Sequence, residues 1–322
     1  MYESFFGLRE RPFELTPNPR FLLLTPGHRE ALSNLRYGIS ARKALTVLTG
    51  EAGTGKSTII RTVLGQITRG GDGLPPGRAA YINNPTLSRQ EFFELVAREF
   101  RLPSACAESK AKLLLELDRM LRELHATGGS AALVIDEAQS LSLELLEEIR
   151  LLANIETDTV KLLPLVMAGQ PELAEWLNQP ELRQLKQRIA LRCRLEPLTV
   201  NETAAYVAAR LRHAGADPAA VFTREAIRTI FERSKGLPRT INVICDNALV
   251  TAFALSRIPV GVDIVNDVCR DFELPGGHRI EPPPQPVALE IESDESAAAA
   301  RETQSAGRLS LLRGWRPRRH AS

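Results

Sequence analysis

The sequence predicts an α/β fold, a parallel sheet with helices on both faces, followed by an all-helical region. Short apolar runs alternate with longer helical patterns from Ala44 to Leu195, which is typical of strand–helix–strand units. A glycine-rich loop joins the first apolar run to the next helical segment. From Thr199 onwards only helical patterns remain. A chain of 322 residues is long enough for two domains and tails.

Residues 1–40 are expected to be an ordered lead-in segment. Aromatic residues and prolines are frequent there, and a helical stretch, His28–Ile39, ends the segment. The aromatic and proline signals are Phe5, Phe6, Pro12, Phe13, Pro17, Pro19 and Phe21.

Residues 41–198 carry the alternating patterns of the sheet domain. Pro164 is unfavourable inside a central strand because it has no N–H to donate. We therefore expect regular pairing of its strand to begin after it. The predicted strands are Ala44–Leu48, Arg78–Asn83, Ala131–Ile135, Leu162–Ala168 and Ala190–Leu195, and the predicted helices after the glycine-rich loop are Ser88–Phe100, Lys110–His125 and Leu143–Ala153.

Residues 199–273 are predicted to form a helical lid domain. Thr199 and Thr223 are suitable N-caps because a hydroxyl can accept from the free amides of a first helical turn. The predicted helices are Val200–His213, Thr223–Ser234, Pro238–Ser256 and Val262–Phe272.

Residues 274–322 have the composition of a disordered tail, rich in proline at first and in arginine at the end. The basic stretch Leu309–Arg319 allows two interpretations, docking on an anionic surface, either membrane or nucleic acid, or a solvated tail. Composition favours the solvated tail.

The glycine-rich loop is a P-loop and predicts binding of a nucleoside triphosphate. Glycines let backbone N–H groups wrap a phosphate chain, and the free amides of the following helix attract anions. A simple glycine turn is the alternative, since the pattern arises by chance in roughly 1 in 100 chains of this length. The strand before the loop and the helix after it favour the P-loop. The predicted ATP-binding residues are Gly50, Glu51, Ala52, Gly53, Thr54, Gly55, Lys56, Ser57 and Thr58.

A second half-site follows the apolar run Ala131–Ile135, which ends in Asp136 and Glu137. This is a Walker B pattern. We expect Ser57 and Asp136 to hold Mg²⁺ and Glu137 to polarise the attacking water. An isolated strand end of this kind is more often only solvated, but the P-loop upstream favours ATP hydrolysis.

Charge and cysteine content limit the class of protein. The chain has 41 Lys and Arg against 39 Asp and Glu, so its charge does not favour nucleic acid as the main partner. Four isolated cysteines without metal-site spacing predict reduced, mostly buried thiols of a cytoplasmic protein. We find neither a signal-peptide pattern at the start nor the apolar run of about 18 residues that spans a membrane.

The order of the predicted domains resembles that of the AAA+ ATPases. Several short sequence motifs are similar to those of the ExeA-like, or general secretion pathway protein A, family. The resemblance covers residues 1–272. The matching sequence motifs are Tyr2–Leu8, Pro12-Phe13, His28–Leu32, the P-loop, Ile135–Gln139, Leu146–Leu152, Gly169–Leu173, Leu185–Ile189 and Gly236–Arg239.

This resemblance implies further catalytic residues. Gln170, at the end of the fourth strand, would be a sensor between the γ-phosphate and water, with a turn amide at Pro171 as the alternative. Arg239 would be a second sensor at the start of a lid helix, with a plain surface arginine as the alternative.

The resemblance also implies an arginine finger, donated across a subunit interface to the site of a neighbour. Arg188 is the first candidate and Arg183 is its rival. His28 would frame the adenine, although an imidazole there can equally be a satisfied core group.

The family implies a homo-oligomeric ATPase that uses ATP and Mg²⁺ to assemble or remodel a cell-envelope secretion or export complex. Secretion-type members carry a membrane helix and a wall-binding region after the ATPase, a pattern that residues 274–322 lack. Shorter relatives accompany exopolysaccharide export and protein sorting. We expect a cytoplasmic protein, and peripheral contact at the inner membrane through the basic tail is the alternative to a solvated tail.

Two other functions compete with this one. A DNA-associated ATPase of the transposition-helper or initiator type would share the core, but we find no recognisable DNA-reading element after residue 272. A nucleotide-gated scaffold would bind ATP without turnover, and the intact Glu137, Gln170 and Arg188 argue against it.

Overall fold

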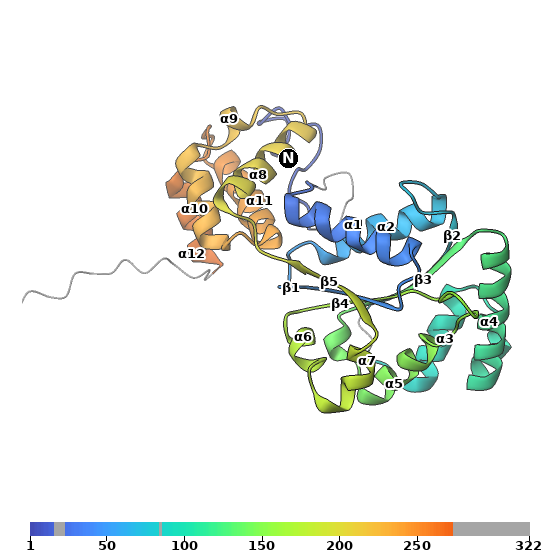
Figure 1. The fold of residues 1–322 in the computed structure, drawn as a ribbon. Helices are drawn as coiled ribbons and strands as arrows, with labels where there is room; N and C mark the ends of the chain where they lie inside the picture. Colours follow the sequence, from blue (N-terminus) through green and yellow to red (C-terminus); the bar gives the residue numbers. More distant parts are fainter. Residues whose placement is uncertain (16–22, 84–85, 273–322) are drawn as a thin grey trace, which may run out of the picture. The chain divides into compact units, whose positions relative to one another are not determined.

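A five-stranded parallel sheet lies at the centre of the α/β part of the computed structural model, which describes residues 1–15, 23–83 and 86–272 (Figure 1). The strand order is β2-β3-β4-β1-β5, and every neighbouring pair is parallel. The predicted α/β fold class is therefore confirmed. The strands are β1 (Leu45–Gly50), β2 (Gly77–Asn83), β3 (Ser130–Asp136), β4 (Leu165–Gly169) and β5 (Ile189–Leu195).

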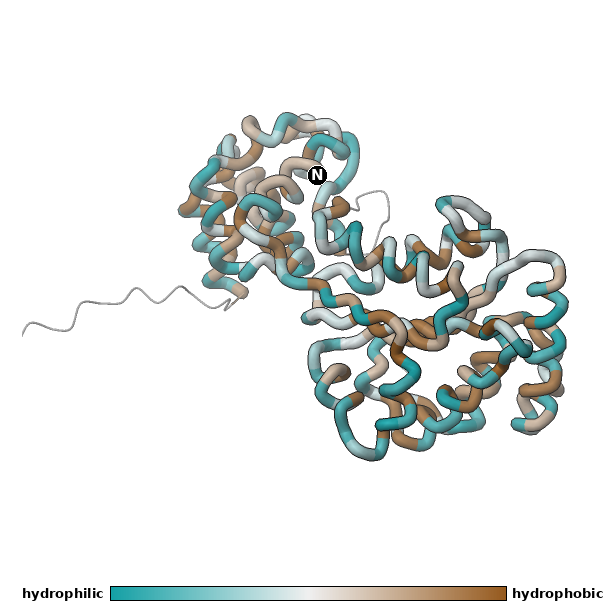
Figure 2. Tube along the Cα trace, in the orientation of Figure 1, coloured by the Kyte–Doolittle hydropathy of each residue, from teal (hydrophilic) through white to brown (hydrophobic). Residues whose placement is uncertain are grey.

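Helices cover both faces of this sheet, α1 and α2 on one face and α3 to α7 on the other (Figure 1). Side chains alternate along each strand. In β3, Leu133 and Ile135 join the core under α3 to α5, whereas Ala132 and Val134 join the core under α1 and α2. Hydrophobic residues accordingly gather along the strands between the two layers (Figure 2). The helices are α1 (Pro26–Ser40), α2 (Lys56–Arg69), α3 (Arg89–Glu99), α4 (Lys110–Ala126), α5 (Leu143–Leu152), α6 (Glu172–Trp176) and α7 (Arg183–Lys186).

Pro164 precedes β4, as the sequence predicts. Pairing with β3 begins at Leu165, and the Pro164 carbonyl still accepts from the Leu133 N–H at 3.0 Å. The proline therefore supplies its one backbone acceptor at a position where no donor is needed.

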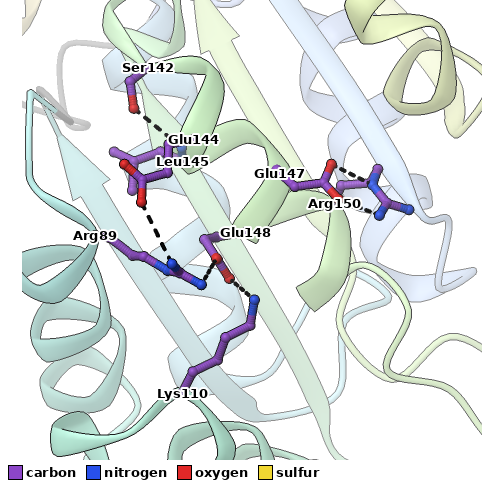
Figure 3. A network of polar contacts seen from close by, with 8 residues as sticks. All are labelled: Arg89, Lys110, Ser142, Glu144, Leu145, Glu147, Glu148 and Arg150. Atoms are coloured by element: carbon purple, nitrogen blue, oxygen red, sulfur yellow. Dashed lines mark hydrogen bonds and ion pairs between the residues drawn. The ribbon is translucent and has the colours of Figure 1, made fainter.

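A buried carboxylate fixes α5 against α3 and α4 (Figure 3). Glu148 is 5% exposed and receives Nη2 of Arg89 and Nζ of Lys110, each at 2.6 Å. Two cations offset the cost of burying the carboxylate, so loss of either would leave charge poorly compensated. This network therefore joins three of the helices that cover the face of the sheet opposite α1 and α2.

The helical region after β5 forms its own core. Thr199 and Thr223 accept from amides of the first turns of α8 and α10, as the sequence predicts. The helices are α8 (Val200–His213), α9 (Pro218–Val221), α10 (Arg224–Ser234), α11 (Pro238–Ala254) and α12 (Val262–Asp271).

The beginning of the chain packs into this helical core. Tyr2, Phe6, Leu8 and Phe13 are buried among residues of α8 to α12. The Arg9 N–H donates to the Ala214 carbonyl at 2.7 Å. The lead-in is thus ordered in its described part, but it contributes to two cores, since its helix α1 packs on the sheet.

Several sequence predictions fall outside the described residues, namely those for Pro17, Pro19, Phe21 and the tail 274–322. The four cysteines are buried and unpaired, in agreement with the prediction of mostly buried thiols. No helix in residues 1–15, 23–83 or 86–272 combines the length and apolar character needed to cross a bilayer.

The short helices were not predicted. They are α6, α7 and α9 together with the 3-10 turns η2 (Ser104–Glu108), η3 (Ala138–Ser140) and η4 (Pro180–Leu182). A run of three to five residues is too short to show the helical spacing of apolar residues, because that pattern is recognised over about 11 residues or more.

Candidate functional site

The carboxyl ends of β1, β3 and β4 bring the P-loop, Asp136, Glu137 and Gln170 to one edge of the sheet. Thr49 in β1 is in register with Gly169 in β4, and Ile135 in β3 is in register with Met167 in β4. The residues that follow these strands are therefore neighbours. This edge is where ligands bind in parallel α/β sheets.

The loop between β1 and α2 depends on its glycines. Gly55 is the residue before α2 and has a φ of 104°, a conformation that glycine adopts without strain. Gly53 has a φ of 85°, and a Cβ there would lie 2.7 Å from Cβ of Arg239. At these two positions of the predicted P-loop, the left-handed backbone conformation disfavours residues other than glycine. At Gly53 the close contact with Arg239 excludes a side chain as well.

Lys56 begins α2 and turns back over the loop. Its Nζ donates to the Gly50 carbonyl at 2.6 Å and to the Glu51 carbonyl at 3.0 Å, and the residue is 4% exposed. Burial lowers the pKa of the Lys56 ammonium, and the negative charges of Glu137 and Asp136 partly offset that shift. A cation is therefore held on the inner side of the loop.

Asp136 connects the end of β3 to the P-loop. The Ser57 hydroxyl donates to Oδ2 of Asp136 at 2.8 Å, and the Tyr81 hydroxyl donates to the same oxygen at 3.0 Å. The Glu137 N–H donates to Oδ1 at 3.0 Å. Three donors therefore fix the orientation of a carboxylate that is 1% exposed.

These groups suit Mg²⁺ better than a softer metal. Mg²⁺ prefers hard oxygen ligands and is often bound through one or two protein groups and substrate phosphates. The Ser57 hydroxyl and the Asp136 carboxylate are such oxygens, and they already touch. The described residues contain no cluster of three or more His, Cys, Asp or Glu that could form an all-protein metal site.

Glu137 is held in an unusual backbone conformation directly after β3. Its φ is 54° and ψ is 39°, values uncommon for a residue with a side chain. The Gln139 side chain donates from Nε2 to Oε2 of Glu137 at 2.6 Å. Glu137 is also one of the residues that line the cavity described next.

A cavity of about 300 Å³ lies beside the P-loop, at the lower end of the size range of ligand pockets. Its walls come from the P-loop, from Glu137, from the N-terminal segment and α1, and from the helical region. The residues that line it are Glu14, Leu15, Leu23, His28, Gly53, Thr54, Gly55, Lys56, Ser57, Thr58, Glu137, Leu198, Tyr206, Arg210, Pro238, Arg239 and Asn242.

His28 connects α1 to the P-loop. Its Nε2 lies 3.0 Å from the Thr54 carbonyl, and its Nδ1 lies 2.7 Å from the Thr25 hydroxyl. Since a carbonyl can only accept, Nε2 carries the proton and Nδ1 accepts from Thr25. Burial lowers the pKa of His28, against the opposite effect of the Thr54 hydrogen bond. His28 is thus a satisfied buried group that also lines the cavity, and its contact with adenine stays a prediction.

The helical region contributes a polar wall to the cavity. The Tyr206 hydroxyl donates to Oδ1 of Asn242 at 2.9 Å. The Arg210 guanidinium lies 4.9 Å from the centre of the Tyr206 ring and donates to the Pro12 carbonyl at 2.6 Å. This wall therefore joins α8, α11 and the N-terminal segment.

Arg239 lies at the start of α11 and lines the cavity. Its backbone N–H donates to the Gly53 carbonyl at 3.3 Å. The structure thus brings the predicted second sensor into direct contact with the P-loop.

The other predicted catalytic residues lie outside the lining of this cavity. Gln170 follows β4, and its backbone N–H donates to Oε1 of Gln139 at 3.1 Å. Arg188 is half-buried just before β5, and Arg183 is exposed in α7. Among the described residues, the cavity lining includes Glu137 and Arg239 but not Gln170, Arg188 or Arg183.

Sequence reasoning missed five residues of this site. Gln139 lies in the family motif Ile135–Gln139, and Tyr81 lies in a predicted strand. Nothing in the sequence marked either residue as part of the site. The cavity wall was not predicted because it joins segments far apart in the chain. The missed residues are Tyr81, Gln139, Tyr206, Arg210 and Asn242.

Comparison with known proteins finds a matching family model and a related protein. Residues 39–177 match a family model described as AAA domain. Over 256 residues the chain is 44% identical to general secretion pathway protein A of Aeromonas hydrophila, a match that covers 79% of this chain and 45% of that protein. The chain therefore matches less than half the length of that relative.

Solved structures with a similar fold include the Aeropyrum pernix ORC2 protein, with a TM-score of 0.63 at 19% identity over 81% of this chain and 71% of that one. Cdc6p of Pyrobaculum aerophilum has a TM-score of 0.59 at 17% identity over 78% and 70% of the two chains. At these identities the likeness concerns the fold alone.

Proposed function

We propose that this chain, a member of the ExeA-like AAA+ ATPases, binds ATP with Mg²⁺ and hydrolyses it to drive assembly or remodelling of a cell-envelope secretion or export complex. One observation carries the catalytic part. The Ser57 hydroxyl contacts the Asp136 carboxylate at 2.8 Å, which joins the P-loop and the Walker B strand end into one site beside a cavity.

Each group would have its own task in hydrolysis. Backbone amides of the P-loop and the start of α2 would bind the phosphates, and Lys56 would exchange its two loop carbonyls for phosphate oxygens. Ser57 and Asp136 would hold Mg²⁺, which neutralises charge on the phosphates when bound. Glu137 would orient and polarise the attacking water.

The remaining residues would sense and complete the site. Arg239 would report the nucleotide to the helical lid, since its backbone already contacts Gly53. Gln170 would reach the γ-phosphate from the end of β4. Arg188, or its rival Arg183, would act on the site of a neighbouring chain, which requires a homo-oligomer.

The cellular role rests on the relative from Aeromonas hydrophila, named for the general secretion pathway. We propose a cytoplasmic protein that works at the inner membrane with an export or secretion protein as its client. The division into a lead-in (1–40), a sheet domain (41–198), a lid (199–273) and a tail (274–322) remains part of this proposal.

The test separates ATP binding from ATP hydrolysis. A Glu137→Gln variant should bind a fluorescent ATP analogue with the affinity of the wild type, because the amide leaves Lys56, Ser57 and Asp136 in place. Its release of phosphate should fall by on the order of 100-fold or more, since the amide cannot polarise water.

A Glu172→Gln variant is the matched control. Glu172 is exposed and its charge also acts on Lys56, but it is not one of the proposed catalytic groups. It should hydrolyse ATP at the rate of the wild type. Wild-type turnover in the Glu137→Gln variant would refute the proposed role of this carboxylate.

A further inference from the structure

The Gln139 side chain bridges two parts of the proposed catalytic site. Its Nε2 donates to Oε2 of Glu137 at 2.6 Å, and its Oε1 accepts from the backbone N–H of Gln170 at 3.1 Å. We propose that Gln139 is a positioning residue that holds Glu137 for water activation and couples the carboxylate to the end of β4. This inference rests on the proposed function, because it assigns a partner to Glu137.

The orientation of the amide follows from its partners. A backbone N–H can only donate, so the atom of Gln139 that faces Gln170 must be the oxygen. An ionised carboxylate can only accept, so the atom that faces Glu137 must be the NH₂ group. The two contacts therefore require a carboxamide, and neither a carboxylate nor an apolar side chain can make both.

The local backbone leaves room for this bridge. A Cβ at Gly169, the last residue of β4, would lie 2.4 Å from Oε1 of Gln139. The missing side chain at Gly169 thus accommodates the Gln139 amide. Gln139 lies in η3, whose first turn is closed by donation from the Ser140 N–H to the Glu137 carbonyl at 2.9 Å. Glu137 and Gln139 therefore belong to one short rigid turn.

The bridge has a chemical consequence for Glu137. Gln139 occupies one carboxylate oxygen and leaves the other available to accept a hydrogen bond from water. It also connects that carboxylate to the peptide that begins Gln170, the proposed γ-phosphate sensor. A shift of the Gln170 backbone would therefore reach Glu137 through a single side chain.

Two substitutions at Gln139 test the bridge. Gln139→Leu keeps the approximate volume and removes both hydrogen bonds. Gln139→Glu keeps the shape, but at neutral pH it places a second carboxylate against Glu137, and like charges at this distance repel.

Gln66 provides a matched control. Its side chain is also half-buried, donates to Oδ2 of Asp72 at 2.7 Å and accepts from Nε of Arg36 at 2.9 Å. It thus forms the same kind of bridge, a carboxylate on one side and a donor on the other, away from the cavity. Gln66→Leu should leave hydrolysis unchanged.

We expect Gln139→Leu to lower kcat by on the order of 10- to 100-fold, within the range of general acid–base effects. The KM for ATP and the affinity for a fluorescent ATP analogue should stay within about threefold of the wild type. Gln139→Glu should be similarly slow, with the same unchanged affinity for the ATP analogue. Because this substitution keeps the shape of the side chain, a fall in its kcat cannot come from lost packing.

Two results would overturn the inference. One is a kcat for Gln139→Leu within about threefold of that of the Gln66→Leu control. The other is a Gln139→Glu variant whose kcat is within about threefold of that of the wild type. If Gln139→Leu does not fold, the nearly isosteric Gln139→Glu decides the question alone. Wild-type turnover in Glu137→Gln would instead refute the proposed function, whereas a slow Glu137→Gln beside an unaffected Gln139→Leu would refute only the bridge.

Discussion

A Lys56→Ala substitution should abolish ATP binding and leave the fold intact. Without nucleotide, the change removes two hydrogen bonds from Nζ to the Gly50 and Glu51 carbonyls, each contributing about 1.5–3 kcal/mol when the donor is charged. It also removes a buried cation whose burial is unfavourable, as the lowered pKa of Lys56 indicates. These effects oppose each other, so the unliganded variant should lose only about 1–2 kcal/mol of unfolding free energy.

With nucleotide the two proteins should differ strongly. ATP at a hundred times its Kd stabilises a protein by about 2.7 kcal/mol, which is a rise in Tm of roughly 4–5 °C for a protein of this size. The assay is thermal unfolding with and without ATP and Mg²⁺. The wild type should show this rise, and Lys56→Ala should show none at the same ATP concentration.

Lys112→Ala provides the control for this comparison. Lys112 is exposed and pairs with Glu108 on the surface, with an N–O distance of 3.3 Å. Its substitution should leave the ATP-induced rise in Tm unchanged. Equal rises in the wild type and in Lys56→Ala would refute the assignment of the P-loop as the phosphate site.

Two further predictions concern the oligomer and the metal. Mixing inactive Arg188→Ala with inactive Glu137→Gln should restore phosphate release, because an intact Glu137 site can then face a neighbour that supplies Arg188. A mixture that stays inactive despite measured subunit exchange would exclude Arg188 as the finger. The same conclusion would follow if Glu137→Gln regained activity when mixed with Arg183→Ala but not when mixed with Arg188→Ala. Tyr81→Phe removes one donor to Asp136 and should raise the Mg²⁺ concentration for half-maximal hydrolysis by roughly 3- to 10-fold, the equivalent of one hydrogen bond. An unchanged Mg²⁺ requirement would show that Tyr81 does not position the carboxylate.

The centre of the sheet could be predicted because β1, β3 and β4 are buried on both faces. Ala131–Ile135 reads as one continuous apolar run, and all of it is buried in β3. The P-loop could be predicted because its chemistry requires particular residues at fixed spacing in one short segment. Local signals were also enough for the caps at Thr199 and Thr223.

The rest of the site could not be predicted because it depends on contacts between distant segments. Arg210 meets the Pro12 carbonyl across 198 positions of the chain, and Tyr206 meets Asn242 across 36. Gln139 contacts Gln170 at a separation of 31. No pattern within one segment carries such information, so these partners became visible only after the chain folded.

The most direct test of the account is phosphate release from ATP by the purified wild-type protein as Mg²⁺ is varied. We predict release that saturates with Mg²⁺, disappears when the metal is chelated and returns when Mg²⁺ is added back, because Ser57 and Asp136 form a site that needs the metal for hydrolysis. A protein that assembles and is stabilised by ATP, yet releases no phosphate at any Mg²⁺ concentration, would contradict the claim that this site hydrolyses ATP.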